Sequence, residues 1–147
     1  MGNKEIIRYN RENTIMSIKR YVANKDNSIT NAFKENLTLR GTSANMGGSD
    51  VLEVFSIYGQ STTSSIEKQR IIIEFPVNTV LGDRDSSKIP SSGSVNFVLK
   101  MSNAAHAETL PKSFNLSVAP LLAAWDEGLG LDMEGYTDTG DSNWISA

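Results

Sequence analysis

Carboxylates, one histidine and a few aromatic residues are the side chains of this 147-residue chain that could do chemistry. Six carboxylates lie within residues 126–141, separated by four glycines. Carboxylate oxygens on a glycine-rich loop suit a hard cation such as Ca²⁺. Their spacing does not follow the EF-hand loop, so a solvated acidic loop is the favoured alternative. The candidate metal ligands are Asp126, Glu127, Asp132 and Glu134.

Catalysis has little support in the sequence. His106 is the single histidine, and no nucleophile motif accompanies it. A Ser–His–acid triad stays open in principle, because its members can lie far apart in a chain. An isolated loop histidine is more often a solvated polar residue. We therefore expect no enzyme, no catalytic residue, and no cofactor beyond the candidate structural Ca²⁺.

Aromatic residues suggest a different kind of site. Exposed Tyr and Trp rings can stack on sugar rings, which makes Tyr58, Tyr136 and Trp144 candidate carbohydrate-binding residues. Trp125 directly follows an apolar run, so we expect it in the core. For Trp144 the two interpretations are balanced.

Charge is distributed unevenly along the chain. Residues 1–40 carry a net +4, residues 41–125 a net −1 and residues 126–147 a net −6. A basic start and an acidic end suit copies that meet head to tail. Two solvated ends with a chance imbalance are the alternative, which we slightly favour. Residues 1–13 are expected to form an N-terminal arm, whose candidate assembly contacts are Ile6, Ile7, Arg8, Tyr9 and Arg11.

Several partner classes are disfavoured. The overall net charge of −3 argues against a basic protein that coats nucleic acid, and Gly41–Gly48 fits neither phosphate-binding glycine pattern. No apolar run approaches the roughly 18 residues of a membrane helix. The first residues lack the apolar middle of a secretion signal, and the absence of cysteine excludes disulfides. We expect no membrane and no specific nucleic acid as partner.

Three apolar, strand-like runs organise the rest of the chain, at residues 70–75, 95–99 and 114–118. Two of them alternate apolar with polar or charged residues. This alternation is the period expected when one face of a sheet is buried.

Shorter segments complete the predicted fold. Short strands separated by turn signals are typical of sandwiches and jelly rolls, and not of βαβ units. We therefore predict an all-β fold, an antiparallel β-sandwich or jelly roll with at most one short helical turn. It would form a single domain over residues 14–147, with an acidic C-terminal loop at 126–147. The further elements are strands at 14–22, 36–40 and 51–58, a turn at 25–28, a long loop at 41–50 and a helical turn at 120–125.

Five segments in order carry a resemblance to a known family. They are the motif from Asn45 to Val54, the motif Arg70-Ile71-Ile72-Ile73-Glu74-Phe75, the apolar runs at residues 95–99 and 114–118, and the motif Trp125-Asp126-Glu127-Gly128. In this order the chain resembles the DNRLRE-type β-sandwich family over roughly residues 37–147. The resemblance implies a β-sandwich related to carbohydrate-binding modules. The chain departs from the family pattern at Phe75-Pro76, where the family usually has Phe-Asp.

The stretch from Trp125 to Met133 is also similar to structural proteins of tailed phages. We therefore expect a non-catalytic structural protein of a virus particle: a head decoration, connector or fibre-type component. It would be located in the virion and contact other virion proteins and copies of itself. The alternative is a carbohydrate-binding or adhesion module of a phage or cell-surface protein, which would bind glycans outside the cell.

Overall fold

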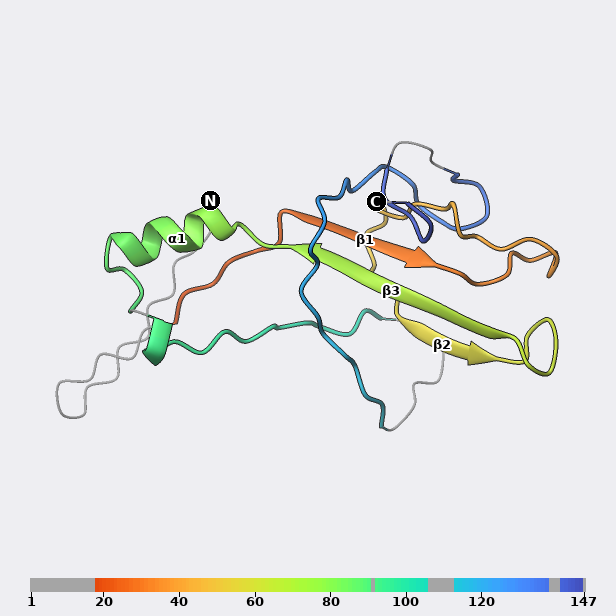
Figure 1. Cartoon of the computed structure of the whole chain (residues 1–147), viewed down its shortest axis with the longest axis horizontal. Helices are drawn as coiled ribbons and strands as arrows, with labels where there is room; N and C mark the ends of the chain where they lie inside the picture. The colour runs from red at the N-terminus through yellow and green to blue at the C-terminus, as the bar shows by residue number, and fades with distance from the viewer. Residues whose placement is uncertain (1–17, 91, 106–112, 138–140, 147) are drawn as a thin grey trace. The chain divides into compact units, whose positions relative to one another are not determined.

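The computed structural model describes residues 18–90, 92–105, 113–137 and 141–146. Its regular elements are three strands, one α-helix and one 3-10 turn (Figure 1). The strands form an antiparallel sheet in the order β1-β3-β2. The elements are β1 (Lys25–Thr30), β2 (Phe55–Tyr58), β3 (Ile66–Glu74), α1 (Val77–Asp85) and η1 (Ser92–Ser94).

The central strand β3 is the one that the sequence predicts best. Its three consecutive isoleucines are β-branched and favour extended backbone. β1 pairs with β3 from Lys25 opposite Glu74 to Thr30 opposite Gln69. β2 pairs with the other edge, from Phe55 opposite Gln69. The prediction of a sheet-rich, antiparallel fold is confirmed at this level.

The turn predicted at residues 25–28 is wrong, because these residues form most of β1. Asn27 and Ser28 were assigned to a turn because such side chains bond nearby backbone. Here they are buried and bond distant backbone instead. Asn27 Nδ2 donates to the carbonyl oxygen of Ser142 at 2.9 Å. Ser28 Oγ accepts from the amide of Glu53 at 3.1 Å.

Five predicted strands are absent or reduced. Residues 95–99 and 114–118 form no strand, and neither do residues 36–40 or the described part of 14–22. Asn36 Oδ1 accepts from the amides of Thr38 and Leu39, which closes a turn in which Leu37 has a φ of 52°. Of the strand predicted at 51–58, only β2 forms.

The helix prediction is also wrong. Residues 120–125 form no helical turn, whereas α1 has nine residues and exceeds the single turn expected. Pro76 directly precedes α1, a favourable position because proline lacks the amide that a first turn leaves unpaired. Val77, Thr79 and Val80 are weak helix formers, so the sequence did not predict this helix.

Asp83 anchors α1 by tertiary contacts. It is buried, and its carboxylate accepts from Lys19 Nζ, from the Tyr21 hydroxyl at 2.9 Å and from Lys88 Nζ at 3.3 Å. The Lys19 ammonium group holds the pKa of Asp83 at about 2, helped by Tyr21 and Lys88. Burial, and the bond to Asp83, raise the pKa of Tyr21.

A pH prediction follows from Asp83. Its pKa is lower folded than unfolded, where it is about 4, so its stabilisation is complete above pH 4 and disappears as pH falls towards 2. In Asp83→Asn this pH dependence is expected to be missing. Thermal unfolding of both proteins between pH 2 and 6 tests this. Equal loss of melting temperature in both proteins over that interval would contradict it.

The chain divides into two compact units, whereas the sequence predicts one domain over residues 14–147. The first comprises Met1–Ala23 and Phe75–Val98, and the second comprises Asn24–Glu74 and Leu99–Ala147. The sheet lies in the second unit. The predicted arm at residues 1–13 lies outside the described residues.

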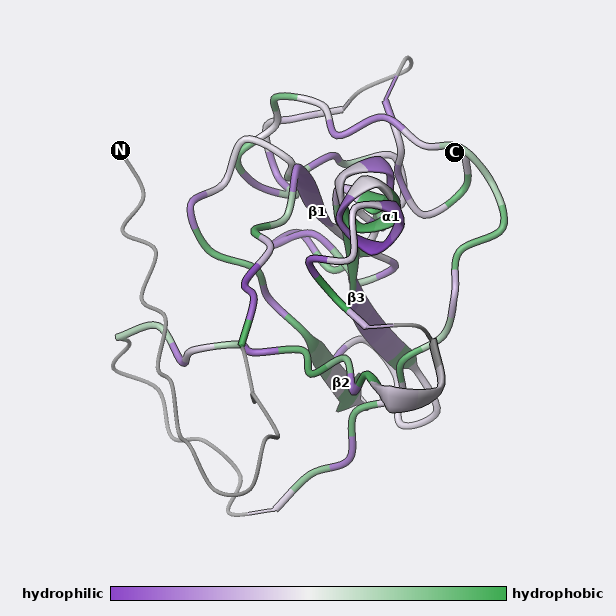
Figure 2. Ribbon diagram, turned by 90° about the vertical axis from the view of Figure 1, so that its left-hand side faces the viewer, coloured by the Kyte–Doolittle hydropathy of each residue, from purple (hydrophilic) through white to green (hydrophobic). Residues whose placement is uncertain are grey.

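Among the described residues the buried set is unusually polar. Glu67 on β3 is fully buried, and its carboxylate accepts from the amide of Phe33 at 3.1 Å and the hydroxyl of Ser65 at 3.4 Å. Many hydrophobic residues, green in Figure 2, lie instead on ribbon outside the strands and helix. The buried polar residues are Asn27, Ser28, Thr30, Asn45, Ser65, Glu67, Gln69, Asp83, Ser142 and Asn143.

Candidate functional site

Asn45 joins two of the sequence motifs. Its side chain is fully buried. Nδ2 donates to the carbonyl oxygens of Glu127 at 2.8 Å and Ser142 at 2.9 Å. Oδ1 accepts from the amides of Gly47 at 3.0 Å and Gly130 at 3.3 Å. Two donors and two acceptor positions are the full capacity of an amide side chain, so Asn45 is completely satisfied.

Glycines allow the two loops to touch. A Cβ on Gly47 would lie 1.9 Å from the carbonyl oxygen of Glu127. A Cβ on Gly130 would lie 1.8 Å from the carbonyl oxygen of Asn45. Both obstacles are backbone atoms, which cannot turn aside. Gly128 has a φ of 77°, the left-handed region where glycine is favoured.

Asn27 ties the same contact to the sheet. Its Oδ1 accepts from the amide of Met46 at 3.0 Å, and its Nδ2 shares the carbonyl oxygen of Ser142 with Asn45. Ser142 Oγ in turn accepts from the amide of Asp126 at 3.0 Å. We call Asn27, Asn45 and Ser142 the amide cluster. It fixes two loops against β1 through hydrogen bonds to backbone.

Three of the four candidate metal ligands accept hydrogen bonds from backbone amides. Glu127 Oε1 accepts from the amide of Asp26 at 2.7 Å. Burial and the Glu127 charge raise the pKa of Asp26. Asp132 Oδ1 accepts from the amides of Glu134 and Gly135, at 2.8 and 2.7 Å.

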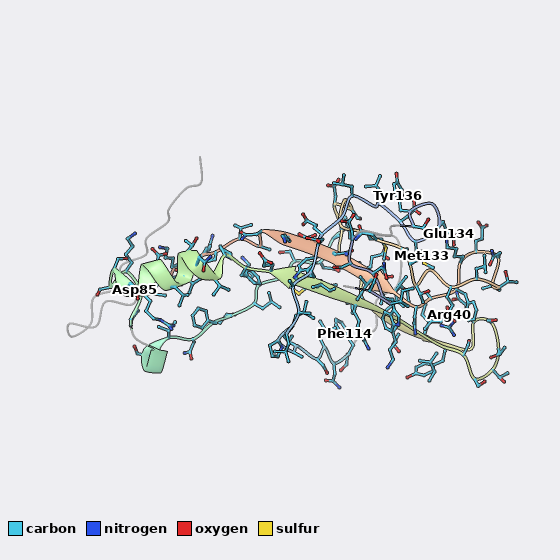
Figure 3. The ribbon with its side chains drawn as sticks, turned by 45° about the horizontal axis from the view of Figure 1, so that its top comes forward. Arg40, Asp85, Phe114, Met133, Glu134 and Tyr136 are labelled. Atoms are coloured by element: carbon cyan, nitrogen blue, oxygen red, sulfur yellow. The ribbon has the colours of Figure 1, made fainter. Side chains whose placement is uncertain are left out.

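The other two candidate ligands, Glu134 and Asp126, do not complete a metal site with Glu127 and Asp132. Glu134 Oε1 accepts from the amide of Glu35 at 2.6 Å, and Asp126 is exposed. In Figure 3, Glu134 lies near Met133 and Tyr136, and Arg40 lies below them on the right-hand side of the view. In the described part of the chain, no group of three or more His, Cys, Asp or Glu side chains is placed to hold a metal ion. The calcium site stays a prediction.

The two tryptophans differ in exposure. Trp125 is buried, with Lys25 Nζ 5.7 Å from its ring centre and 3.2 Å from its carbonyl oxygen. Trp144 is half-buried, with the Arg70 guanidinium 4.3 Å from its ring centre. Its backbone amide donates to the carbonyl oxygen of Thr42 at 3.1 Å. Trp144 therefore keeps part of its ring accessible.

Two of the three predicted sugar-binding residues share one face of the sheet. The register places Tyr58 opposite Ile66, so both point to the face that carries Arg70. Ile66 and Arg70 are exposed on this face, and Tyr58 is 70% exposed. Ile66 and Arg70 are four residue steps apart along β3, a distance of about 13 Å. Tyr136 lies elsewhere, in the loop beside Gly130.

A hollow of about 280 Å³ opens beside Trp144. Residues of β1 and β3 line it, together with Leu121 and residues 142–146. Its polar lining residues include Ser142 and Asn143, which are engaged with neighbouring backbone. The apolar lining residues are Ile29, Ile72, Leu121, Trp125, Trp144 and Ile145.

Two runs predicted as strands have no regular structure, and most of their large apolar side chains are exposed. In the run at 114–118, Phe114 is 61% exposed and Val118 is 82% exposed. In the run at 95–99, Phe97 is 66% exposed and Val98 is 84% exposed. Sequence reasoning recognised these runs as strand-like but missed that they have no partner strand here. It also missed the amide cluster, for which the Asn45 motif was the available signal.

The remaining predicted site residues cannot be placed. His106 and the predicted assembly contacts Ile6, Ile7, Arg8, Tyr9 and Arg11 lie outside the described residues. Within the described part of the chain, no helix combines the length and apolar content needed to span a bilayer. Comparison with protein-family models, curated proteins and solved structures gave no match for this chain.

Proposed function

We propose that this protein is a non-catalytic structural component of a virus particle, such as a head decoration, connector or fibre-type protein. The observation that carries the proposal is the exposure of two apolar, strand-like runs, at residues 95–99 and 114–118. Large exposed apolar side chains that recur along a run are typical of interfaces between proteins. Neighbouring copies or other virion proteins would cover these runs.

The proposal extends to the fold. Both runs have strand composition, and the three-stranded sheet has one polar buried side. Paired with further strands, the runs would supply the second layer of an antiparallel β-sandwich or jelly roll. The resemblance to the DNRLRE-type family supports the same architecture. The proposal assigns no catalytic role, and the four backbone bonds of Asn45 give that side chain a structural one.

Light scattering coupled to size-exclusion chromatography tests this proposal. Apolar contacts are not screened by salt, so we expect oligomers at micromolar concentration in both 50 mM and 500 mM NaCl. An oligomer that only high salt dissolves would instead assign assembly to the basic and acidic ends of the chain. A monomer at both salt concentrations would contradict self-assembly.

Carbohydrate binding is the second candidate, favoured by the shared sheet face of Tyr58 and Trp144. On a glycan array, Trp144→Ala and Tyr58→Ala are each expected to weaken binding about tenfold, the equivalent of roughly 1.4 kcal/mol. Tyr136→Ala is the matched control and should bind like the unchanged protein, because Tyr136 lies beside Gly130 in a loop and not on the strands that carry Tyr58 and Arg70. No binding by the unchanged protein, or equal loss in all three variants, would count against this site.

A further inference from the structure

The run from Phe114 to Val118 is apolar at every second residue and belongs to no strand of the described sheet. Residues 114–118 make no hydrogen bond to other described residues. In Figure 1 the segment that follows residue 113 crosses the strands of the sheet and does not run alongside them. All residues from Ser113 to Leu122 are exposed. Its backbone amides and carbonyls are therefore available to another chain.

We propose that two copies of this protein pair through residues 114–118, antiparallel, across a two-fold axis at Leu116. In this register Leu116 faces its own copy and Phe114 faces Val118. Aromatic and β-branched residues are favourable cross-strand partners. Asn115 then faces Ser117, so all apolar side chains lie on one side of the ribbon and all polar ones on the other. The sequence of the run is thus complementary to itself.

Charge and chain direction support the same pairing. No charged residue occurs between Ser113 and Trp125, so two copies approach without like-charge repulsion. Pro120 has no amide to donate, so it ends the ladder shortly after Val118.

The other exposed run, at residues 95–99, is less complementary to a second copy of itself. Antiparallel pairing of residues 95–99 about Phe97 would place Val98 opposite Asn96, an apolar residue against a polar one. Lys100 directly follows that run, whereas the neighbours of Phe114–Val118 are uncharged up to Trp125 on the C-terminal side. We therefore assign the two-fold contact to residues 114–118.

Two paired strands alone are barely stable in water, so the ribbon needs a surface to pack on. Leu121 supplies the connection, because it follows Pro120 and lines the hollow beside Ile72 and Trp125. The apolar side of the ribbon would extend this lining. The inference rests on the proposed assembly function and adds the partner, a second copy, and the register.

Single-cysteine variants test the register, since the chain has no cysteine of its own. Directly opposed residues have Cα atoms about 4.5–5.5 Å apart, within disulfide reach. Leu116→Cys is expected to form a disulfide-linked dimer under mild oxidation. Phe114→Cys should cross-link to Val118→Cys in a mixture, and neither should cross-link to itself. Leu122→Cys is the control: it is 96% exposed but outside the register, and should stay uncross-linked.

A charge substitution tests the energetics independently. Leu116→Lys places two ammonium groups opposite each other on the axis. It should raise the dissociation constant of the dimer at least tenfold, so that the variant is a monomer at micromolar concentration. Leu122→Lys should not. Because Leu116 is 52% exposed, both variants are expected to keep the fold of the unchanged monomer, which far-ultraviolet circular dichroism checks. Loss of the dimer should lower the melting temperature of Leu116→Lys only to that of the unchanged protein at dilutions where it is monomeric.

The outcomes separate this inference from the proposed function. An oligomer that survives Leu116→Lys, without cross-linking of Leu116→Cys, would overturn the pairing and leave assembly through another surface. A monomeric unchanged protein would overturn both. Uniform cross-linking of all four cysteine variants would indicate non-specific contact and would also overturn the register.

Discussion

Alanine at Gly47 or Gly130 is expected to destabilise the second unit by about 3 kcal/mol or more. The added Cβ would lie within 2 Å of a backbone carbonyl oxygen at both positions, at 1.9 and 1.8 Å. Backbone cannot rotate away as a flexible side chain can, so the loops must separate. Separation also breaks the bonds of Asn45 to Glu127 and Gly130 in the other loop. Domains are stable by only about 5–15 kcal/mol, so this loss is a large fraction.

Denaturant unfolding followed by tryptophan fluorescence measures this effect, because the buried Trp125 adjoins the contact. Gly135→Ala is the matched control in the same acidic loop. Its Cβ would meet only the Asp132 carboxylate oxygen, at 3.6 Å, so we expect a change within about 0.5 kcal/mol. Similar midpoints for Gly47→Ala, Gly130→Ala and Gly135→Ala would refute the close loop contact.

Asn45→Asp is expected to destabilise the protein by about 3 kcal/mol or more, although the shape of the side chain is unchanged. The aspartate keeps the acceptor for Gly47 but cannot donate. Its charge would face the carbonyl oxygens of Glu127 and Ser142, which Asn45 Nδ2 now reaches at 2.8 and 2.9 Å. A buried carboxylate against two carbonyls is unfavourable because nothing compensates its charge.

Two further variants make this prediction specific. Asn45→Ala should cost a similar amount, since it leaves buried amides and a carbonyl without partners. Asn24→Ala is the control, because Asn24 is exposed and only its backbone amide bonds Glu74; its effect should stay within about 0.5 kcal/mol. If Asn45→Asp unfolded at the same denaturant concentration as the unchanged protein, the central role of Asn45 would be wrong.

These two predictions concern stability, whereas the proposed function lies on other surfaces. The amide cluster holds two loops on β1, and its side chains bond to backbone. The surfaces open to partners are the apolar runs and the sheet face with Tyr58 and Trp144. Assembly variants at Leu116 and sugar variants at Trp144 should therefore leave the amide cluster intact.

Local sequence determined β3 and the extended character of the apolar runs. Three β-branched isoleucines in succession favour extended backbone wherever they lie, so the run at residues 70–75 was predicted. It coincides with the second half of β3, whereas the start of β3 at Ile66 was missed. The burial of Trp125 follows from its apolar neighbours in the same way. The Asn45 and Trp125 motifs occur together in the family pattern that the chain resembles. This did not show that the two loops are in contact through Asn45.

Tertiary structure alone decided β1, α1 and the amide cluster. Asn27 and Ser28 favour turns locally, and become strand residues because Ser142 and Glu53, far away in the chain, bind their side chains. α1 has weak helix formers, and Asp83 ties it to Lys19, Tyr21 and Lys88. Hydrogen bonds between residues this distant leave no periodic pattern in a sequence. Whether an apolar run finds a partner strand is likewise a property of the folded chain and its neighbours, since the run itself has the same composition in either case.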